Sequence, residues 1–171
     1  MSDTFDLRNI TMNRDSTALT GLSSSVTTVS TTSTPSYYLN GEIIASTNQS
    51  GGATPTTDIA TGEAFVALSG TTAATGTGCV FVFGWDSSAP TVFSVAQGKV
   101  VKSADVTNGA AAYEFPSIPA TFCPVAYVTI SYVGSSTWTF GTSNWNASTA
   151  TIGTVINCAM LPSQPLTAAS A

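Results

Sequence analysis

Short apolar runs broken by turn residues limit what this chain can fold into more than any other feature of its sequence. From residue 36 onward, runs rich in Val, Ile, Thr and aromatic residues alternate with segments that contain Gly, Pro or Asn. The apolar spacing of an amphipathic helix is absent over any window of about 11 residues. Short strands that are separated by frequent turns are typical of β-sandwiches and barrels. The sequence therefore predicts an all-β fold of roughly eight strands, a jelly-roll-like β-sandwich preceded by an extended N-terminal arm.

Two segments carry the strongest strand patterns. Residues 125–132 read Val-Ala-Tyr-Val-Thr-Ile-Ser-Tyr, so even-numbered positions are expected to share one face of a strand and odd-numbered positions the other. Residues 79–85 are apolar at both parities. A strand with that composition is expected to be covered on both of its faces.

Turn signals mark further elements. The dipeptide Asn40-Gly41 stands between two apolar runs and supplies the positive φ angles of a type I′ turn, which predicts a hairpin. A second hairpin is expected within residues 91–101, with Gln97-Gly98 near its tip. Residues 103–115 are expected to form one short helical turn.

The composition changes near residue 35 and predicts three parts: an extended N-terminal arm at 1–35, a β-sandwich domain at 36–165 and a tail at 166–171. Residues 20–34 are mostly Ser, Thr and Val, which disfavour a helix. Two interpretations of this part remain open: a mobile tail, or an arm that orders against a neighbouring subunit. In the second case the contacts are the apolar and cationic residues Phe5, Leu7, Arg8, Ile10, Arg14, Leu22, Val26 and Val29.

Charge is scarce. The chain has four basic and nine acidic residues, no histidine and a net charge of −5. Four cations are too few to neutralise a nucleic acid backbone or to hold an anionic membrane, so we expect neither partner. No apolar run is long enough to span a membrane. The first residues lack the basic start and apolar stretch of a secretory signal, which predicts synthesis in a cytoplasm.

Few residues have the chemistry of catalysis. Without histidine the usual catalytic triads are excluded. Asp58 with Glu63, or Asp105 with Glu114, would supply the carboxylate pair of a glycoside hydrolase, but acids scattered over a polar surface also produce near pairs by chance. We therefore predict that the protein is not an enzyme and binds no cofactor.

Three cysteines, Cys79, Cys123 and Cys158, each lie in an apolar stretch. Buried free thiols that pack as small apolar side chains are the expected arrangement. A single disulfide with one free thiol, or a zinc site completed by a carboxylate, are the alternatives.

Trp138, Phe140 and Trp145 cluster around a predicted turn. The expected arrangement is that the three rings close one end of the core or fill a contact between subunits. The alternative is a contact patch of Trp138, Phe140 and Trp145, since exposed rings of this kind stack on sugars.

One stretch of the chain resembles a known family. Pro124–Ile130, then the segment from Trp138 to Asn146, then a closing Leu161-Pro162, resemble the small β-rich virion proteins of tailed bacteriophages. In that family a proline-led strand precedes an aromatic residue, a Gly-Thr pair, an Asn-Ala pair and a closing Leu-Pro. Ala126 stands where the family often has glycine, and the resemblance covers residues 36–165 but not the arm.

The resemblance implies a cement or decoration protein that binds the capsid exterior and stabilises contacts between capsomers. It implies a virion location, the major capsid protein and further copies of the chain as partners, a dimer or trimer, and no catalytic residues. The alternative function is a receptor- or glycan-binding module of a phage fibre or spike.

Overall fold

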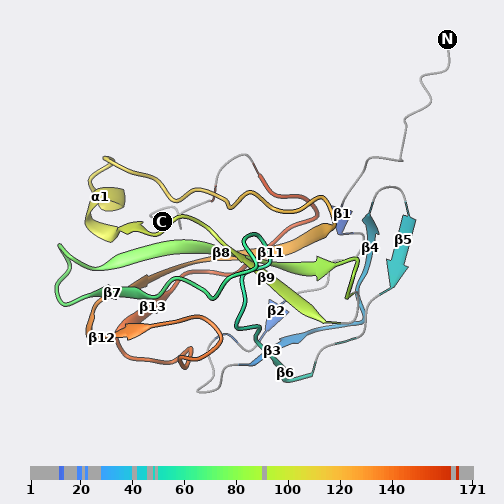
Figure 1. Cartoon of the computed structure of the whole chain (residues 1–171), viewed down its shortest axis with the longest axis horizontal. Helices are drawn as coiled ribbons and strands as arrows, with labels where there is room; N and C mark the ends of the chain where they lie inside the picture. Colours follow the sequence, from blue (N-terminus) through green and yellow to red (C-terminus); the bar gives the residue numbers. More distant parts are fainter. Residues whose placement is uncertain are drawn as a thin grey trace, which may run out of the picture.

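The computed structural model describes residues 12–13, 19–20, 22, 28–39, 42–45, 48, 50–89, 92–162 and 165. These residues form an all-β structure of antiparallel sheets, as the sequence predicts (Figure 1). The helix among them is α1 (Ser103–Thr107), which lies where one short helical turn is expected and is followed by Gly109 at a φ of 73°.

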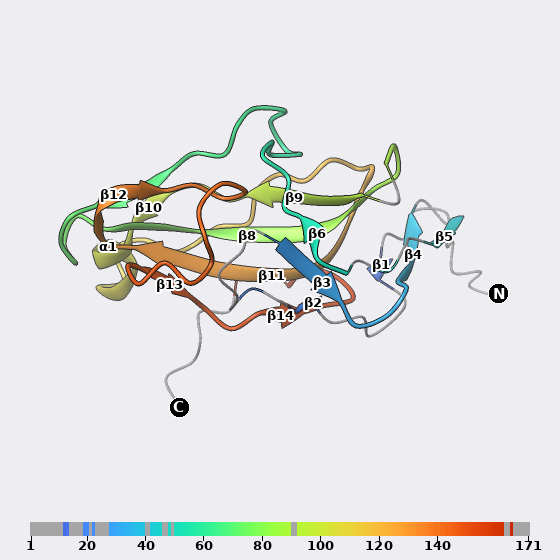
Figure 2. The same ribbon diagram turned by 90° about the horizontal axis from the view of Figure 1, so that it is seen from below.

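A central antiparallel sheet organises the fold. Its two long strands, β8 (Thr77–Asp86) and β11 (Phe122–Tyr132), pair along their whole length. Shorter strands flank this pair on both sides (Figure 2). They are β9 (Phe93–Gln97) and β10 (Val101–Lys102) beside β8, and β13 (Ala150–Ile152) and β14 (Ile156–Asn157) beside β11.

Strand β8 is buried on both faces, which confirms the prediction for residues 79–85. Phe81, Phe83 and Trp85 point into the larger of two cores. Val80 and Val82 point into the smaller core on the opposite face. Successive strand residues face opposite sides of a sheet, so a strand covered on both sides has to be apolar throughout.

Short strands cover the larger core, and irregular chain covers the smaller one. The short strands form three further sheets, in the orders β1-β4-β5, β2-β3-β6 and β12-β7. The coil on the other face contributes Phe115, Ile118 and Leu161 to the smaller core. The short strands are β1 (Met12–Asn13), β2 (Leu19–Thr20), β3 (Thr28–Thr31), β4 (Ser36–Leu39), β5 (Glu42–Ala45), β6 (Gly52–Ala53), β7 (Leu68–Gly70) and β12 (Gly134–Trp138).

The described part of residues 1–35 is not a detached arm. Leu22 and Val29 are 5 % and 0 % exposed and belong to the same core as Trp85. The prediction that these two residues contact a neighbouring subunit is therefore wrong, because the larger core of the same chain buries them. The predicted contacts Phe5, Leu7, Arg8, Ile10, Arg14 and Val26, and the tail at 166–171, lie outside the described residues.

A β-bulge changes the predicted faces of β11. From Ala126 onward the even-numbered side chains point into the larger core, as expected. Val125 also points there, because the register with β8 shifts between Pro124 and Ala126 and leaves Val125 as an extra residue. Proline has no N–H for the ladder, and a bulge is where a sheet tolerates it.

The first predicted hairpin is confirmed and the second is wrong. Leu39 pairs with Glu42, so two residues connect β4 to β5, although Asn40 and Gly41 themselves lie outside the described residues. Strand β9 instead pairs with β8, and the chain reverses between them rather than at Gln97-Gly98. A Cβ at Gly98 would lie 2.3 Å from the carbonyl oxygen of Glu114, so this glycine permits a close backbone approach.

Candidate functional site

Of the two candidate carboxylate pairs, Asp58 and Glu63 differ in burial, whereas Asp105 and Glu114 are both exposed. Asp58 is buried, and its Oδ1 accepts hydrogen bonds from the N–H of Ala60 at 2.9 Å and of Gln97 at 3.3 Å. Glu63 and Asp105 are exposed. Asp58 therefore organises the loop that follows it, an arrangement that Asx turns share.

Gln97 connects that loop to the central sheet by side-chain hydrogen bonds. The Oε1 of its buried side chain accepts from the N–H of Val66 at 2.7 Å, and its Nε2 donates to the carbonyl oxygen of Val66 at 2.8 Å. The same Nε2 lies 3.4 Å from the Sγ of Cys79. Nothing in the sequence pattern distinguishes this glutamine from an exposed one, so sequence reasoning missed it.

The three thiols are free. Cys79 and Cys123 are buried, as predicted, and Cys158 is half-buried. Burial raises the pKa of Cys79 and of Cys123 to about 12, and that of Cys158 to about 11. The thiols are thus protonated near neutral pH, and the alternative of a disulfide is not realised. Among the described residues no group of three His, Cys, Asp or Glu side chains could hold a metal ion.

Trp138, Phe140 and Trp145 lie in the core, as expected, and the alternative of an exposed contact patch is wrong. Trp138 and Phe140 are 1 % exposed and Trp145 is 2 % exposed. The Phe140 ring packs among its neighbours, with centroids 4.8 Å from Phe81 and 4.7 Å from Phe65. These rings are therefore part of the core, because the turn that carries them folds back over the central sheet.

One groove lies beside this aromatic cluster, with a volume of about 500 Å³. Its lining combines the apolar residues Leu19, Leu22, Trp145, Ile152 and Val155 with Thr20, Asn146 and Gly153. The indole N–H of Trp145 is buried and makes no hydrogen bond, in contrast to that of Trp138, which donates to the carbonyl oxygen of Asn144 at 3.0 Å. The groove runs between β2 and the edge strand β13.

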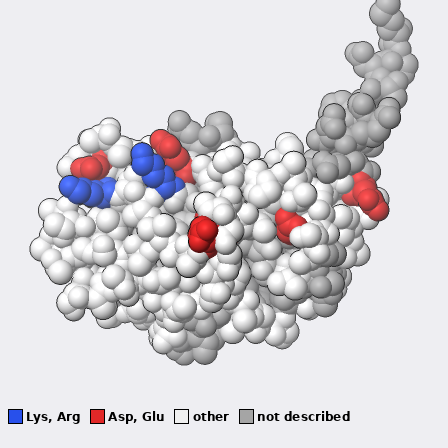
Figure 3. Space-filling view, in the orientation of Figure 1, with Lys and Arg blue, Asp and Glu red and all other residues white. Residues whose placement is uncertain are grey.

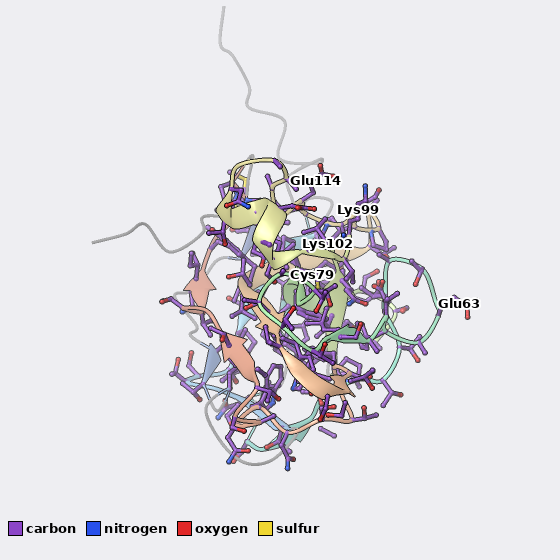
Figure 4. The ribbon with its side chains drawn as sticks, turned by 90° about the vertical axis from the view of Figure 1, so that its left-hand side faces the viewer. Glu63, Cys79, Lys99, Lys102 and Glu114 are labelled. Atoms are coloured by element: carbon purple, nitrogen blue, oxygen red, sulfur yellow. The ribbon has the colours of Figure 1, made fainter. Side chains whose placement is uncertain are left out.

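Among the described residues, those that line the groove and the strands that carry them have no charge. No Asp, Glu, Lys or Arg occurs in residues 16–41 or 115–171, and these segments supply β2, β3, β12, β13 and β14. In Figure 3 the charged residues of the visible face lie over its upper and middle parts, and the described residues of its lower part carry none. Figure 4 shows Lys99, Lys102 and Glu114 together near α1, with Glu63 apart on its loop.

No family model, curated protein or solved structure matches this chain. In the described part of the chain, no helix combines the length and the apolar character needed to cross a membrane. The candidate site is therefore the groove and the uncharged surface around it. Sequence reasoning had the signal for this surface in the long uncharged segments, but it had no means of placing them side by side.

Proposed function

We propose that the protein is a virion structural protein, a cement or decoration protein that binds the capsid exterior and stabilises contacts between capsomers. Its partners are the major capsid protein and further copies of the chain. The fold in this proposal is a jelly-roll-like β-sandwich. The antiparallel central sheet and the layer of short strands over its larger core support that assignment.

The uncharged surface around the groove is the observation that carries the proposal. A surface without charged groups gains little from long-range attraction, so it suits a partner that is present at high local concentration and in a fixed arrangement. Repeated copies on a shell meet both conditions. The dense two-sided core suits a protein that resists deformation, since close-packed interiors are weakly compressible.

Co-sedimentation with expanded capsid shells that lack this protein tests the proposal. The wild-type chain should pellet with the shells at a fixed ratio per capsomer. The part of its affinity that comes from the uncharged surface should change little between low and high salt, whereas a contact made by Arg8 should weaken at high salt. Failure to pellet with such shells at any salt concentration would contradict the proposal.

Terminal deletions test the remaining arm residues. Removal of residues 1–11 takes away Phe5, Leu7, Arg8 and Ile10 without touching the described core, and we expect it to weaken shell binding. Removal of the tail at 166–171 is the matched control and should leave binding unchanged. Equal binding by both deletion variants would show that residues 1–11 do not contact the shell.

The glycan-binding alternative depended on exposed rings at Trp138, Phe140 and Trp145. Because all three are buried, no observation on this structure favours that function, and we do not propose it.

A further inference from the structure

The two edges of the central sheet differ in how they are protected. The β9 edge is covered by the chain itself, since the N–H of Ile59 donates to the carbonyl oxygen of Val95 at 2.9 Å and Asp58 accepts from the N–H of Gln97. On the opposite edge, the N–H of Leu19 donates to the side chain of Asn157 at 3.0 Å. That contact lies at β14, and the described residues provide no such cover for β13.

The register shows which backbone groups of β13 face outward. The N–H of Gly153 donates to the carbonyl oxygen of Thr129, and the N–H of Val133 donates to that of Thr149. Odd-numbered residues of this segment therefore bond to β11. Ile152 lies between them in the ladder, so its N–H and its carbonyl group point away from β11, and no described residue pairs with them.

The edge strand is only three residues long, but it lacks the side chains that usually prevent pairing with another strand. Such edges commonly carry lysine, proline or a bulge that discourages pairing. Residues 150–154 read Ala-Thr-Ile-Gly-Thr, with neither charge nor proline. The uncharged groove lies beside them and is lined by Ile152 itself.

We propose that two copies of the chain pair through these edges, antiparallel, about a two-fold axis at Ile152. The outward N–H and carbonyl group of Ile152 bond reciprocally with those of Ile152 in the second copy. Side chains directly opposite each other in a sheet lie on the same face. The second copy's isoleucine therefore packs beside the groove, and the two central sheets become one continuous sheet.

A second copy fits this edge better than a charged partner does. A two-fold axis brings each residue close to the same residue of the other copy, so any charge there would be repelled by its equivalent. The absence of charged residues throughout 115–171 removes that repulsion. The inference rests on the self-association in the proposed function, but it does not depend on binding to a shell.

Thr151 provides the sharpest test. Its side chain is exposed, and its backbone pairs with Ser131, so a substitution leaves the ladder within the chain intact. In the proposed dimer the two Thr151 residues lie about 8 Å apart, from two residues of strand rise and one strand spacing. Like charges at this separation repel, and opposite charges attract.

Sedimentation velocity on the purified full chain measures the pairing. The wild type should dimerise with a dissociation constant that is insensitive to salt. Thr151→Lys and Thr151→Glu should each weaken the dimer at low salt, by at least about threefold. An equimolar mixture of the two variants should recover dimer formation. Heterodimers should then make up well over half of all dimers, since half is the fraction that random pairing gives. Ser117→Lys and Ser117→Glu make the same changes at an exposed site on the segment before β11 and should have no effect.

A wild type that stays monomeric at high micromolar concentration, or one that forms a trimer, overturns the proposal. So does a dimer that is indifferent to both Thr151 variants. Amide hydrogen exchange on the wild type gives a second measurement that needs no variant. Exchange of the Ile152 N–H should slow as protein concentration rises, and exchange independent of concentration overturns the edge pairing even if the chain dimerises. A monomer that still pellets with shells overturns self-association while leaving shell binding in place.

Discussion

Replacement of Phe140 by alanine tests whether the aromatic cluster is a core. The ring is 1 % exposed and packs against Phe65, Phe81 and Trp145, with centroid separations of 4.7, 4.8 and 5.2 Å. A buried phenylalanine removes roughly 150–250 Å² from water, which at about 25 cal/mol per Å² is worth roughly 4–6 kcal/mol. An alanine side chain retains part of this burial free energy, and measured core truncations of phenylalanine cost about 3–5 kcal/mol. We expect Phe140→Ala to lower the free energy of unfolding by about 4 kcal/mol.

Urea unfolding followed by tryptophan emission measures this loss. Trp85, Trp138 and Trp145 are all buried, so their emission should shift to the red as the chain unfolds. With a urea dependence of about 2 kcal/mol per molar, the midpoint should fall by about 2 M. Protein concentration has to be the same for both proteins, because association shifts apparent stability.

Phe115→Ala is the control. Phe115 is half-buried over the smaller core and stacks edge-on against Tyr127 at 5.0 Å. Phe115→Ala should lower the free energy of unfolding clearly less than Phe140→Ala does. A cost below about 1 kcal/mol for Phe140→Ala, within the range of surface substitutions, would refute the assignment of this ring to the core.

Two further predictions concern buried polar groups. Gln97→Ala removes two hydrogen bonds to the backbone of Val66 and should cost about 1–3 kcal/mol, with faster amide exchange at Val66; unchanged exchange there would contradict the role given to Gln97. Burial raises the pKa of Asp86, but hydrogen bonds from Ser88 and Thr121 outweigh it and hold the pKa below its ordinary value. The ionised form is therefore favoured on folding, so its stabilisation is present above the unfolded-state pKa of about 4 and is lost as the pH falls through the folded-state value. Asp86→Asn should destabilise the protein at neutral pH and lose that difference on acidification; a difference that does not change with pH would contradict this.

Local patterns in the sequence predicted local structure well. The apolar run at 79–85 indicated a strand buried on both faces, and the two-residue connection around Asn40-Gly41 indicated a hairpin. Both signals depend on a few neighbouring residues, whose side-chain alternation and φ preferences act within the segment itself.

Predictions that required knowledge of distant partners failed. The hairpin expected at Gln97-Gly98 did not form, because β9 pairs with β8 and Gly98 instead meets the backbone of Glu114. Val125 changed face because of a bulge in β11, which its local alternation did not reveal. For Trp138 and Trp145 the choice between core, subunit contact and exposed patch could not be settled from the sequence, because it does not show which strands lie beneath them.

The amino-acid sequence alone determined that this chain forms strands and that long parts of its surface carry no charge, since both follow from the residues present in each segment. Tertiary structure decided which apolar residues are buried within the chain, as with Leu22 and Val29, and which strand edge the described residues leave without a partner. The physical reason is that burial of an apolar side chain is favourable against any apolar surface, and a strand edge accepts any strand with free backbone groups. Only the arrangement of distant segments selects among those partners.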